Sequence, residues 1–192
     1  MRALLPSLFV VALVSMPPQA VAEEPAGWVL DSRATAQQLA GRLITELTQA
    51  LAESPAAAIR VCSERAPAIA AEVSAATGAT VGRTAARVRN PANAPTEWQQ
   101  RGLEYFATQL AAGAEPASLE FTETLVVDGH TLRRWMKPVM TAPLCLTCHG
   151  AALAPEVAAA VGERYPADQA TGFAVGDLRG AVFVAWDEAA RP

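Results

Sequence analysis

The chain has 192 residues, of which 52% are hydrophobic and 6% are aromatic. This length fits one domain, or one domain with an appendage, and the apolar content is sufficient for a core, which excludes an intrinsically disordered chain. The 15 Lys and Arg residues against 19 Asp and Glu residues give a formal net charge of −4, and Lys137 is the only lysine. The dense basic surface that nucleic-acid binding requires is missing, so we expect no nucleic-acid partner.

The first residues have the pattern of an export signal. Arg2 gives a positive start, residues 4–16 are mostly apolar, and residues 20–22 form an Ala-Val-Ala cleavage site. The alternative is a retained membrane anchor, but the apolar stretch is short for a membrane-spanning helix. We therefore expect a cleaved signal peptide over residues 1–22 and a periplasmic protein without stable membrane insertion. The mature chain, residues 23–192, is then predicted to form a single domain.

Apolar stripes predict helices in the first part of the mature chain. Ser32 is placed to cap one helix, and Ser54-Pro55 is a typical start of the next. The first stripe consists of Leu39, Leu43, Leu47 and Leu51, and the second of Ile59, Cys62, Ala66, Ile69 and Val73. The second stripe predicts that Cys62 points toward the core. Pro67 is expected to kink or restart this helix, and Gly78 to end it.

After Gly78 the pattern changes to strands and turns. Residues 80–89 predict a strand, and the turn-rich segment 90–95 leads into a helix for which Asn93 is a candidate cap. Apolar residues then alternate over 119–127, as they do in a strand with one buried face. The following Asp-Gly pair predicts a two-residue hairpin turn.

The last part of the chain also predicts strands and loops, together with one short helix. A partner strand is expected over 130–140, a short helix over 155–164 and a loop over 165–172. A final hairpin is predicted from strands over 173–175 and 181–186. Helices followed by a mostly antiparallel sheet with interleaved helices give an α+β fold class.

Cys145-Leu146-Thr147-Cys148-His149 is a C-x-x-C-H sequence, the attachment signature of c-type haem. Two thiols one helical turn apart can add to the two vinyl groups of one porphyrin, and the adjacent His149 can supply the proximal imidazole. A zinc site would need a fourth ligand, and His130 is the only other histidine. A thioredoxin-like dithiol belongs after a first strand, and a structural disulfide leaves His149 unexplained. We expect one covalently attached haem c.

The residues alone leave the second axial ligand of the iron open. The candidates are Cys62, His130, Met136 and Met140. His130 follows a hairpin turn, where solvent exposure is ordinary, and a methionine in a strand is commonly core filler. Cys62 is the cysteine left over after haem attachment, in a chain with an export signal. On this reasoning Cys62 is either an iron ligand or a buried, inert core residue.

The chain resembles the family of small exported single-haem c-type cytochromes with a PAS-like domain, formerly a domain of unknown function. The resemblance lies in blocks that span nearly the whole mature chain in order. These blocks are Ala58-Ile59-x-x-Cys62, Arg89-Asn90-Pro91-x-Asn93-x-Pro95, Pro143-Leu144-Cys145-Leu146-x-Cys148-His149-Gly150, Tyr165-Pro166-x-Asp168-x-Ala170-Thr171-Gly172 and Gly176-Asp177-x-Arg179-Gly180. The C-x-x-C-H alone is shared by many cytochromes, whereas the other blocks make the match specific.

The resemblance implies a PAS-like fold, an antiparallel sheet flanked by helices, and axial ligation of the iron by His149 and Cys62. Arg87, Arg89 and Arg179 either pair with the haem propionates, since a guanidinium suits carboxylates, or form surface or structural ion pairs. Asp168 and Asp177 are expected as turn residues, and Asn90 and Asn93 as partners of local backbone groups.

These observations predict an exported monohaem cytochrome that acts in electron transfer or redox sensing. Two strong axial ligands leave no vacant iron position, so we expect an electron carrier or sensor and not an enzyme. The alternatives are a haem-based gas or redox sensor in which Cys62 dissociates, and a weak peroxidase, for which His130 is the sole candidate distal residue. The expected partner is a redox protein or a separate signalling protein of unknown identity.

Overall fold

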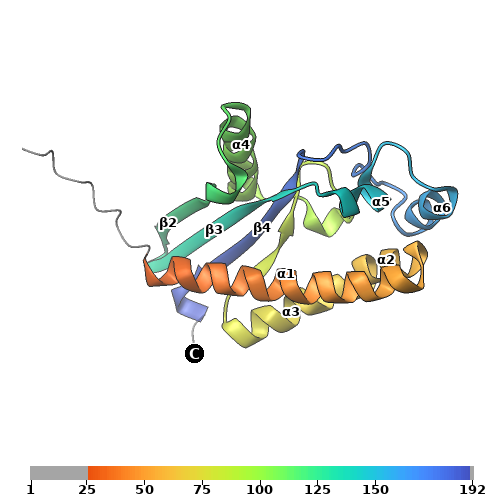
Figure 1. Cartoon of the computed structure of the whole chain (residues 1–192). Coiled ribbons are helices and arrows are strands. Elements are labelled where there is room, and N and C mark those ends of the chain that lie inside the picture. Colours follow the sequence, from red (N-terminus) through yellow and green to blue (C-terminus); the bar gives the residue numbers. More distant parts are fainter. Residues whose placement is uncertain (1–25, 191–192) are drawn as a thin grey trace, which may run out of the picture.

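The computed structural model describes residues 26–190 as a four-stranded sheet with helices on both faces (Figure 1). The helices are α1 (Gly27–Glu53), α2 (Pro55–Arg60), the π-helix η1 (Val61–Arg65), α3 (Ala66–Thr77), α4 (Glu97–Ala111), α5 (Leu146–His149) and α6 (Pro155–Arg164). Short 3-10 turns are η2 (Pro91–Asn93), η3 (Pro116–Ser118), η4 (Pro143–Cys145) and η5 (Glu188–Ala190). The predicted signal peptide lies outside the described residues.

The sheet has the order β1-β4-β3-β2, and all neighbouring strands are antiparallel. The strands are β1 (Thr80–Thr84), β2 (Phe121–Val127), β3 (His130–Met140) and β4 (Leu178–Asp187). Asp128 and Gly129 both have positive φ in the turn between β2 and β3, as the sequence predicts for a two-residue hairpin. The α+β class is confirmed, and the helix-flanked antiparallel sheet is consistent with a PAS-like domain.

Each face of the sheet buries its own apolar core. Trp135 of β3 and Val184 of β4 point toward α1 and α3, where they pack with Leu39. Met136, the next residue of β3, points the other way and packs against α4. Neighbouring residues of a strand face opposite sides, so this pair marks the division between the two cores. Figure 1 shows α1 and α3 on one side of the sheet and α4 on the other.

The helix starts agree with the sequence in part. Ser54 caps α2 by accepting a hydrogen bond from Ala57 N at 3.0 Å, and Gly78 ends α3 with φ 74°. The predicted cap at Ser32 is wrong, because α1 already begins at Gly27. Ser32 is fully buried inside the helix, and its hydroxyl accepts a hydrogen bond from Trp186 Nε1 at 2.8 Å.

Three further predictions of elements are corrected. The strand predicted over 80–89 ends at Thr84, because the chain turns away there and carries its arginines to the loop 165–172. Thr96, in a capping box with Gln99, starts α4 in place of Asn93. The last hairpin does not form, since residues 173–177 make a turn and β4 pairs with β1 and β3.

Among residues 26–190, no helix combines the length and the apolar character needed to cross a bilayer.

Candidate haem-attachment site

The C-x-x-C-H sequence lies beyond the end of β3, where the chain leaves the sheet. Pro143 opens the turn η4 that contains Cys145, and α5 directly follows with Cys148 and His149. The helical backbone places the two cysteines about one turn apart, as attachment to one porphyrin requires. Both thiols are free and half-buried. Figure 1 shows α5 beside α6 at the end of the molecule that also holds α2.

His149 is held by its Nδ1 atom, which lies 2.6 Å from the carbonyl oxygen of Ala170. Because a carbonyl oxygen only accepts, Nδ1 must carry the proton, and Nε2 is left as the basic nitrogen. Burial lowers the pKa of His149 to about 4, and the positive charges of Arg179 and Arg89 contribute in the same direction. The imidazole is therefore neutral near pH 7 and oriented by a backbone group, which is the state in which histidine binds a metal.

Arg89 joins the motif to the loop 165–172. Its Nη2 atom donates to Cys148 O at 2.6 Å and to Ala170 O at 3.2 Å. The same guanidinium forms a two-point ion pair with Asp168, at 3.1 Å from Nε and 3.0 Å from Nη2. Of the two readings that the sequence left open for Arg89, the structural ion pair is the one observed.

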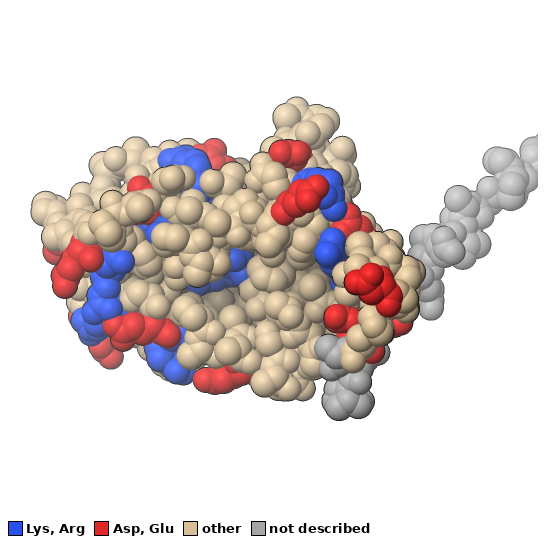
Figure 2. Space-filling view, turned by 180° about the vertical axis from the view of Figure 1, so that it is seen from behind, with Lys and Arg blue, Asp and Glu red and all other residues tan. Residues whose placement is uncertain are grey.

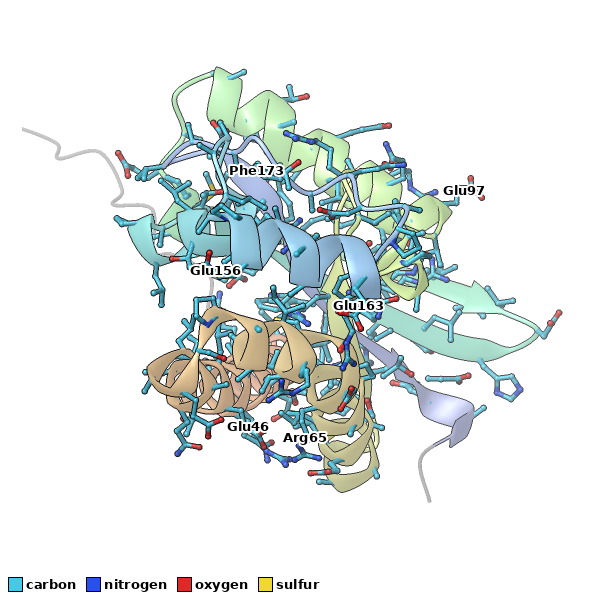
Figure 3. The ribbon with its side chains drawn as sticks, turned by 90° about the vertical axis from the view of Figure 1, so that its right-hand side faces the viewer. Glu46, Arg65, Glu97, Glu156, Glu163 and Phe173 are labelled. Atoms are coloured by element: carbon cyan, nitrogen blue, oxygen red, sulfur yellow. The ribbon has the colours of Figure 1, made fainter. Side chains whose placement is uncertain are left out.

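Phe173 is a site residue that the sequence did not indicate. Its ring meets the ring of His149 edge to face, with the centroids 6.3 Å apart. The guanidinium carbon of Arg87 lies 4.2 Å from the centre of the Phe173 ring, and that of Arg179 lies 5.2 Å from it. Figure 3 shows Phe173 beyond α6, with Glu156 and Glu163 marking that helix. No motif spacing could have revealed this contact, because it depends on the path of a loop.

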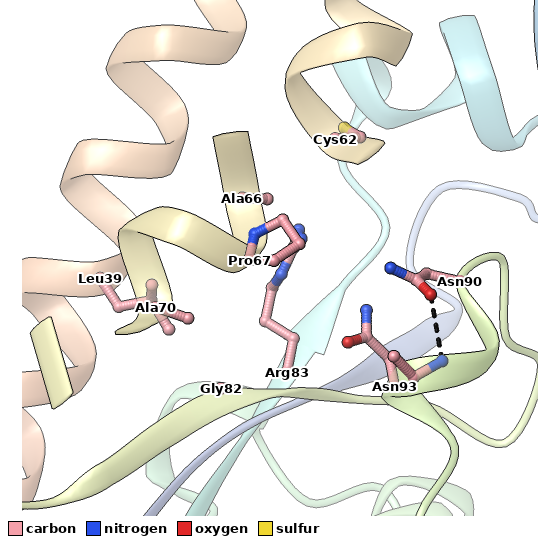
Figure 4. A pocket seen from close by; sticks show the side chains of 10 residues that line it. Leu39, Cys62, Ala66, Pro67, Ala70, Gly82, Arg83, Asn90 and Asn93 are labelled. Atoms are coloured by element: carbon pink, nitrogen blue, oxygen red, sulfur yellow. Dashed lines mark hydrogen bonds between the residues drawn. The ribbon is translucent and has the colours of Figure 1, made fainter. Parts of the chain in front are cut away.

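Cys62 lies in the π-helix η1 and is half-buried. The flanking positions Ile59 and Ala66 are buried as predicted, but Cys62 belongs to none of the core clusters. It lines a cavity of about 90 Å³ instead. Figure 4 shows Cys62 on one side of this cavity, with Asn90 and Asn93 on the other. The prediction of a core-facing Cys62 is therefore corrected.

Cys62 and the motif cysteines lie close enough to influence one another. Burial raises the pKa of Cys148, Arg89 opposes this, and the thiols of Cys62 and Cys145 raise the pKa further. The cavity beside Cys62 is lined by neither motif cysteine and not by His149. The structure thus brings Cys62 close to Cys148 of the motif, and the cavity beside Cys62 is also lined by residues of β1 and η2.

The other three candidates for an axial ligand lie at different points along β3. His130 is exposed at the hairpin end of β3, and ten residues of strand, roughly 30 Å, separate it from Met140 near the motif. Met136 is fully buried against Gly102 of α4. Met140 is half-buried at the end of β3 that leads to the motif.

Two smaller predictions on local contacts are also settled. Asn90 accepts a hydrogen bond from Ala92 N, and Asp177 accepts one from Ala174 N at 2.7 Å, so both side chains bond to turn backbone as expected.

Within residues 26–190, no three His, Cys, Asp or Glu side chains gather closely enough to hold one bare metal ion. The described part of the chain therefore offers no zinc-type cluster.

Comparison with known proteins agrees with the motif blocks. The family model described as Tll0287-like matches residues 19–186. A solved structure, described as the crystal structure of the cyanobacterial haem protein Tll0287, is similar with a TM-score of 0.52 and 29% sequence identity. The alignment covers 65% of this chain and 70% of that chain. No curated protein matches. The chain belongs to the Tll0287-like family.

Proposed function

We propose that the protein is an exported monohaem c-type cytochrome that binds haem through Cys145, Cys148 and His149. The observation that carries this proposal is the state of His149, a neutral imidazole whose Nδ1 is tied to Ala170 O and whose Nε2 is free. The similarity to a cyanobacterial haem protein supports haem as the ligand.

The residues present fit a covalently bound haem. Cys145 and Cys148 offer two free thiols on consecutive helical turns, which is the donor set that thioether formation requires. Arg89 holds Cys148 and the Ala170 carbonyl together, so the ligand and its orienting group cannot move independently. Apolar residues of α2 and α6 pack against Cys148 and shield the motif from water on that side.

We propose electron transfer as the role, with Cys62 as the second axial ligand. The haem supplies a one-electron couple when it is bound. His149 lies on α5 and Cys62 on η1, two helical segments at the same end of the fold. If His149 and Cys62 both held the haem iron, no position would be left for a substrate, which supports a carrier over an enzyme. Its partner would be a separate redox protein.

One observation favours a redox or gas sensor as a second candidate. Cys62 is half-exposed to a cavity and sits in a π-helical turn, a feature that is frequent at functional sites. A ligand in that position can move away from the iron without disturbing a packed core. A signal would then pass to a separate protein. Carbon monoxide binding to the reduced protein distinguishes the two, since rapid binding indicates sensing and no binding indicates transfer.

Attachment is tested with Cys145→Ala, Cys148→Ala and the control Cys62→Ala. Each protein is produced with a cytochrome c maturation system, and denaturation-resistant haem is measured by the pyridine haemochrome spectrum. We expect the wild type and Cys62→Ala to hold one haem per chain. The motif variants should lose most of it. Full haem retention in both motif variants would contradict covalent attachment.

Export is a separate part of the proposal and concerns residues that the structure does not describe. The expected mature protein begins at Glu23 and is recovered from the periplasmic fraction. N-terminal sequencing of the purified holoprotein tests this. Membrane-bound protein that begins at Met1 would overturn it.

A further inference from the structure

Four arginines gather at the end of the fold that carries the motif. This arginine cluster consists of Arg83, Arg87, Arg89 and Arg179. In the part of the chain that the structure describes, only Arg89 of the four has a carboxylate within ion-pair distance. The cluster therefore carries more positive charge than Asp168 can balance. Figure 2 shows Lys and Arg atoms recessed among uncharged ones near the middle of one face.

The hydrogen bonds of Arg87 show that it serves the protein itself. Its Nε atom donates to Gln169 O at 3.1 Å, and its Nη2 atom donates to Thr171 O. The guanidinium also lies over the face of Phe173. Arg87 thus has a structural function equivalent to that of Arg89: both fix the loop 165–172.

Arg179 differs from these two arginines. Its Nη1 atom donates to Arg87 O at 3.3 Å, but its Nε atom is buried and finds no hydrogen-bond partner among the residues that the structure describes. Burial lowers the pKa of Arg179 to about 10, and the positive charges of Arg89 and Arg83 lower it further, yet the group stays cationic near pH 7. Arg179 interacts electrostatically with both Cys145 and His149. It is therefore a half-buried cation, with a fully buried Nε atom, close to both ends of the attachment motif.

A buried cation with an unsatisfied N–H is costly unless an anion approaches it. An unmade hydrogen bond of a buried group costs about 1–3 kcal/mol, and more when the group is charged. A guanidinium presents its donors as a fork that matches the two oxygens of a carboxylate. Since residues 26–190 place no carboxylate within ion-pair distance of Arg179, the chemistry points to a carboxylate of the group bound at the motif.

We propose that Arg179 anchors a propionate carboxylate of the haem through its Nε atom, while Arg87 and Arg89 hold the surrounding loop. The proposal rests on the proposed function, because it requires haem at Cys145 and Cys148. It assigns different functions to arginines that the sequence could not distinguish. The distinction follows from the partners of each guanidinium.

The test uses the holoprotein with Arg179→Gln, Arg179→Lys and the matched control Arg87→Gln. Arg87→Gln removes the same charge from above the same Phe173 ring. Two readouts are measured, the propionate bending bands in the resonance Raman spectrum and the reduction potential. The haemochrome spectrum is recorded for every variant, so loss of haem attachment, which would count against the proposed function, is seen separately.

In Arg179→Gln we expect the propionate bands to shift and the one-electron equilibrium to move about tenfold toward the ferric form, a fall of 59 mV. A cation beside the haem favours the reduced state, and its removal favours the oxidised state. Arg179→Lys keeps the charge but not the fork, so the bands should shift while the potential stays near that of the wild type. Arg87→Gln should leave the bands unchanged.

Two results would overturn the assignment. The first is a set of wild-type propionate bands in a haem-loaded Arg179→Gln. The second is an equal band shift in Arg87→Gln, which would mean that the propionate responds to the general charge of the cluster. If Arg179→Gln does not accumulate, the assignment is tested with Arg179→Lys. Propionate bands in that variant that match those of the wild type would exclude a hydrogen bond from the guanidinium Nε.

Discussion

Arg89 and Asp168 form a two-point ion pair between residues 79 positions apart, and each side chain is only 9% exposed. The ion pair is linked to the attachment motif, because the same guanidinium donates hydrogen bonds to the carbonyl oxygens of Cys148 and Ala170. Burial would raise the pKa of Asp168, but the hydrogen bonds and charge of Arg89 hold it below its ordinary value. Two buried charges are thereby retained beside His149, which is itself neutral near pH 7.

We expect Arg89→Gln to destabilise the protein by about 3 kcal/mol, because it leaves the Asp168 carboxylate buried without its partner. It should also free the Ala170 carbonyl to move, so the absorption spectrum of the haem should change. Urea unfolding of the holoprotein measures the stability. Arg65→Gln is the control, since the side chains of the Arg65–Glu46 pair, 2.9 Å apart and both labelled in Figure 3, are 45% and 32% exposed. An equal loss in both variants would argue against a special role for Arg89.

A second prediction concerns the contact between α4 and the sheet. A Cβ atom on Gly102 would lie 2.4 Å from the sulfur of Met136, which is fully buried, and 3.2 Å from a ring atom of Phe121. Gly102→Ala should therefore destabilise the protein by about 1–3 kcal/mol through overpacking. Gly162→Ala on α6 is the matched control, because nothing lies within 4 Å of a Cβ there. That change should stabilise the helix by about 0.5–1 kcal/mol. Thermal unfolding that shows the same sign for both would contradict the packing.

A third prediction is a loss of stability in acid. Burial would raise the pKa of Glu120, but the hydrogen bonds and charge of Arg33, with Nε–Oε1 at 2.8 Å, lower it below its ordinary value. A lowered carboxyl pKa in the folded state gives stability above the unfolded pKa of about 4.3, which is lost as the pH falls through the folded pKa. We therefore expect Glu120→Gln to be less stable than the wild type at pH 7, with the two melting temperatures converging below about pH 4. Arg33→Gln should produce the same convergence. Parallel curves for either variant would be inconsistent with this pair.

Local patterns predicted most elements of the fold. Residues 155–164, the hairpin at Asp128 and the cap at Ser54 agree with the structure because their signals are contained in a few neighbouring residues. Ser32 shows where local reasoning fails. A serine before an apolar stripe is typical of a cap, but here its hydroxyl donates to Trp28 O inside the helix and accepts from Trp186 Nε1, which lies 154 positions away.

The attachment motif could be read directly from the sequence, but its surroundings could not. The spacing of two cysteines and a histidine predicts a haem-attachment site without any knowledge of the fold. The separate functions of Arg87, Arg89 and Arg179 depend on which carbonyls and carboxylates reach each guanidinium, and only the tertiary structure sets those distances. The π-helical turn at Cys62 was likewise hidden, because the apolar spacing around it matches an ordinary α-helix.

The last prediction tests Cys62 as the second axial ligand. Ligation requires the thiolate, which bound ferric iron stabilises, so replacing the thiolate should favour the ferrous form and raise the reduction potential. Cys62→Ser and Cys62→Ala should both change the ferric absorption spectrum and open the iron to added ligands such as imidazole. Met140→Leu is the matched control, because Met140 is the remaining candidate at the motif end of β3. An unchanged ferric spectrum and potential in both Cys62 variants, together with a changed spectrum in Met140→Leu, would transfer the axial position to Met140. A half-buried cysteine beside a cavity loses little packing when it is shortened, so a large spectral change without a large loss of stability is the result that ligation predicts.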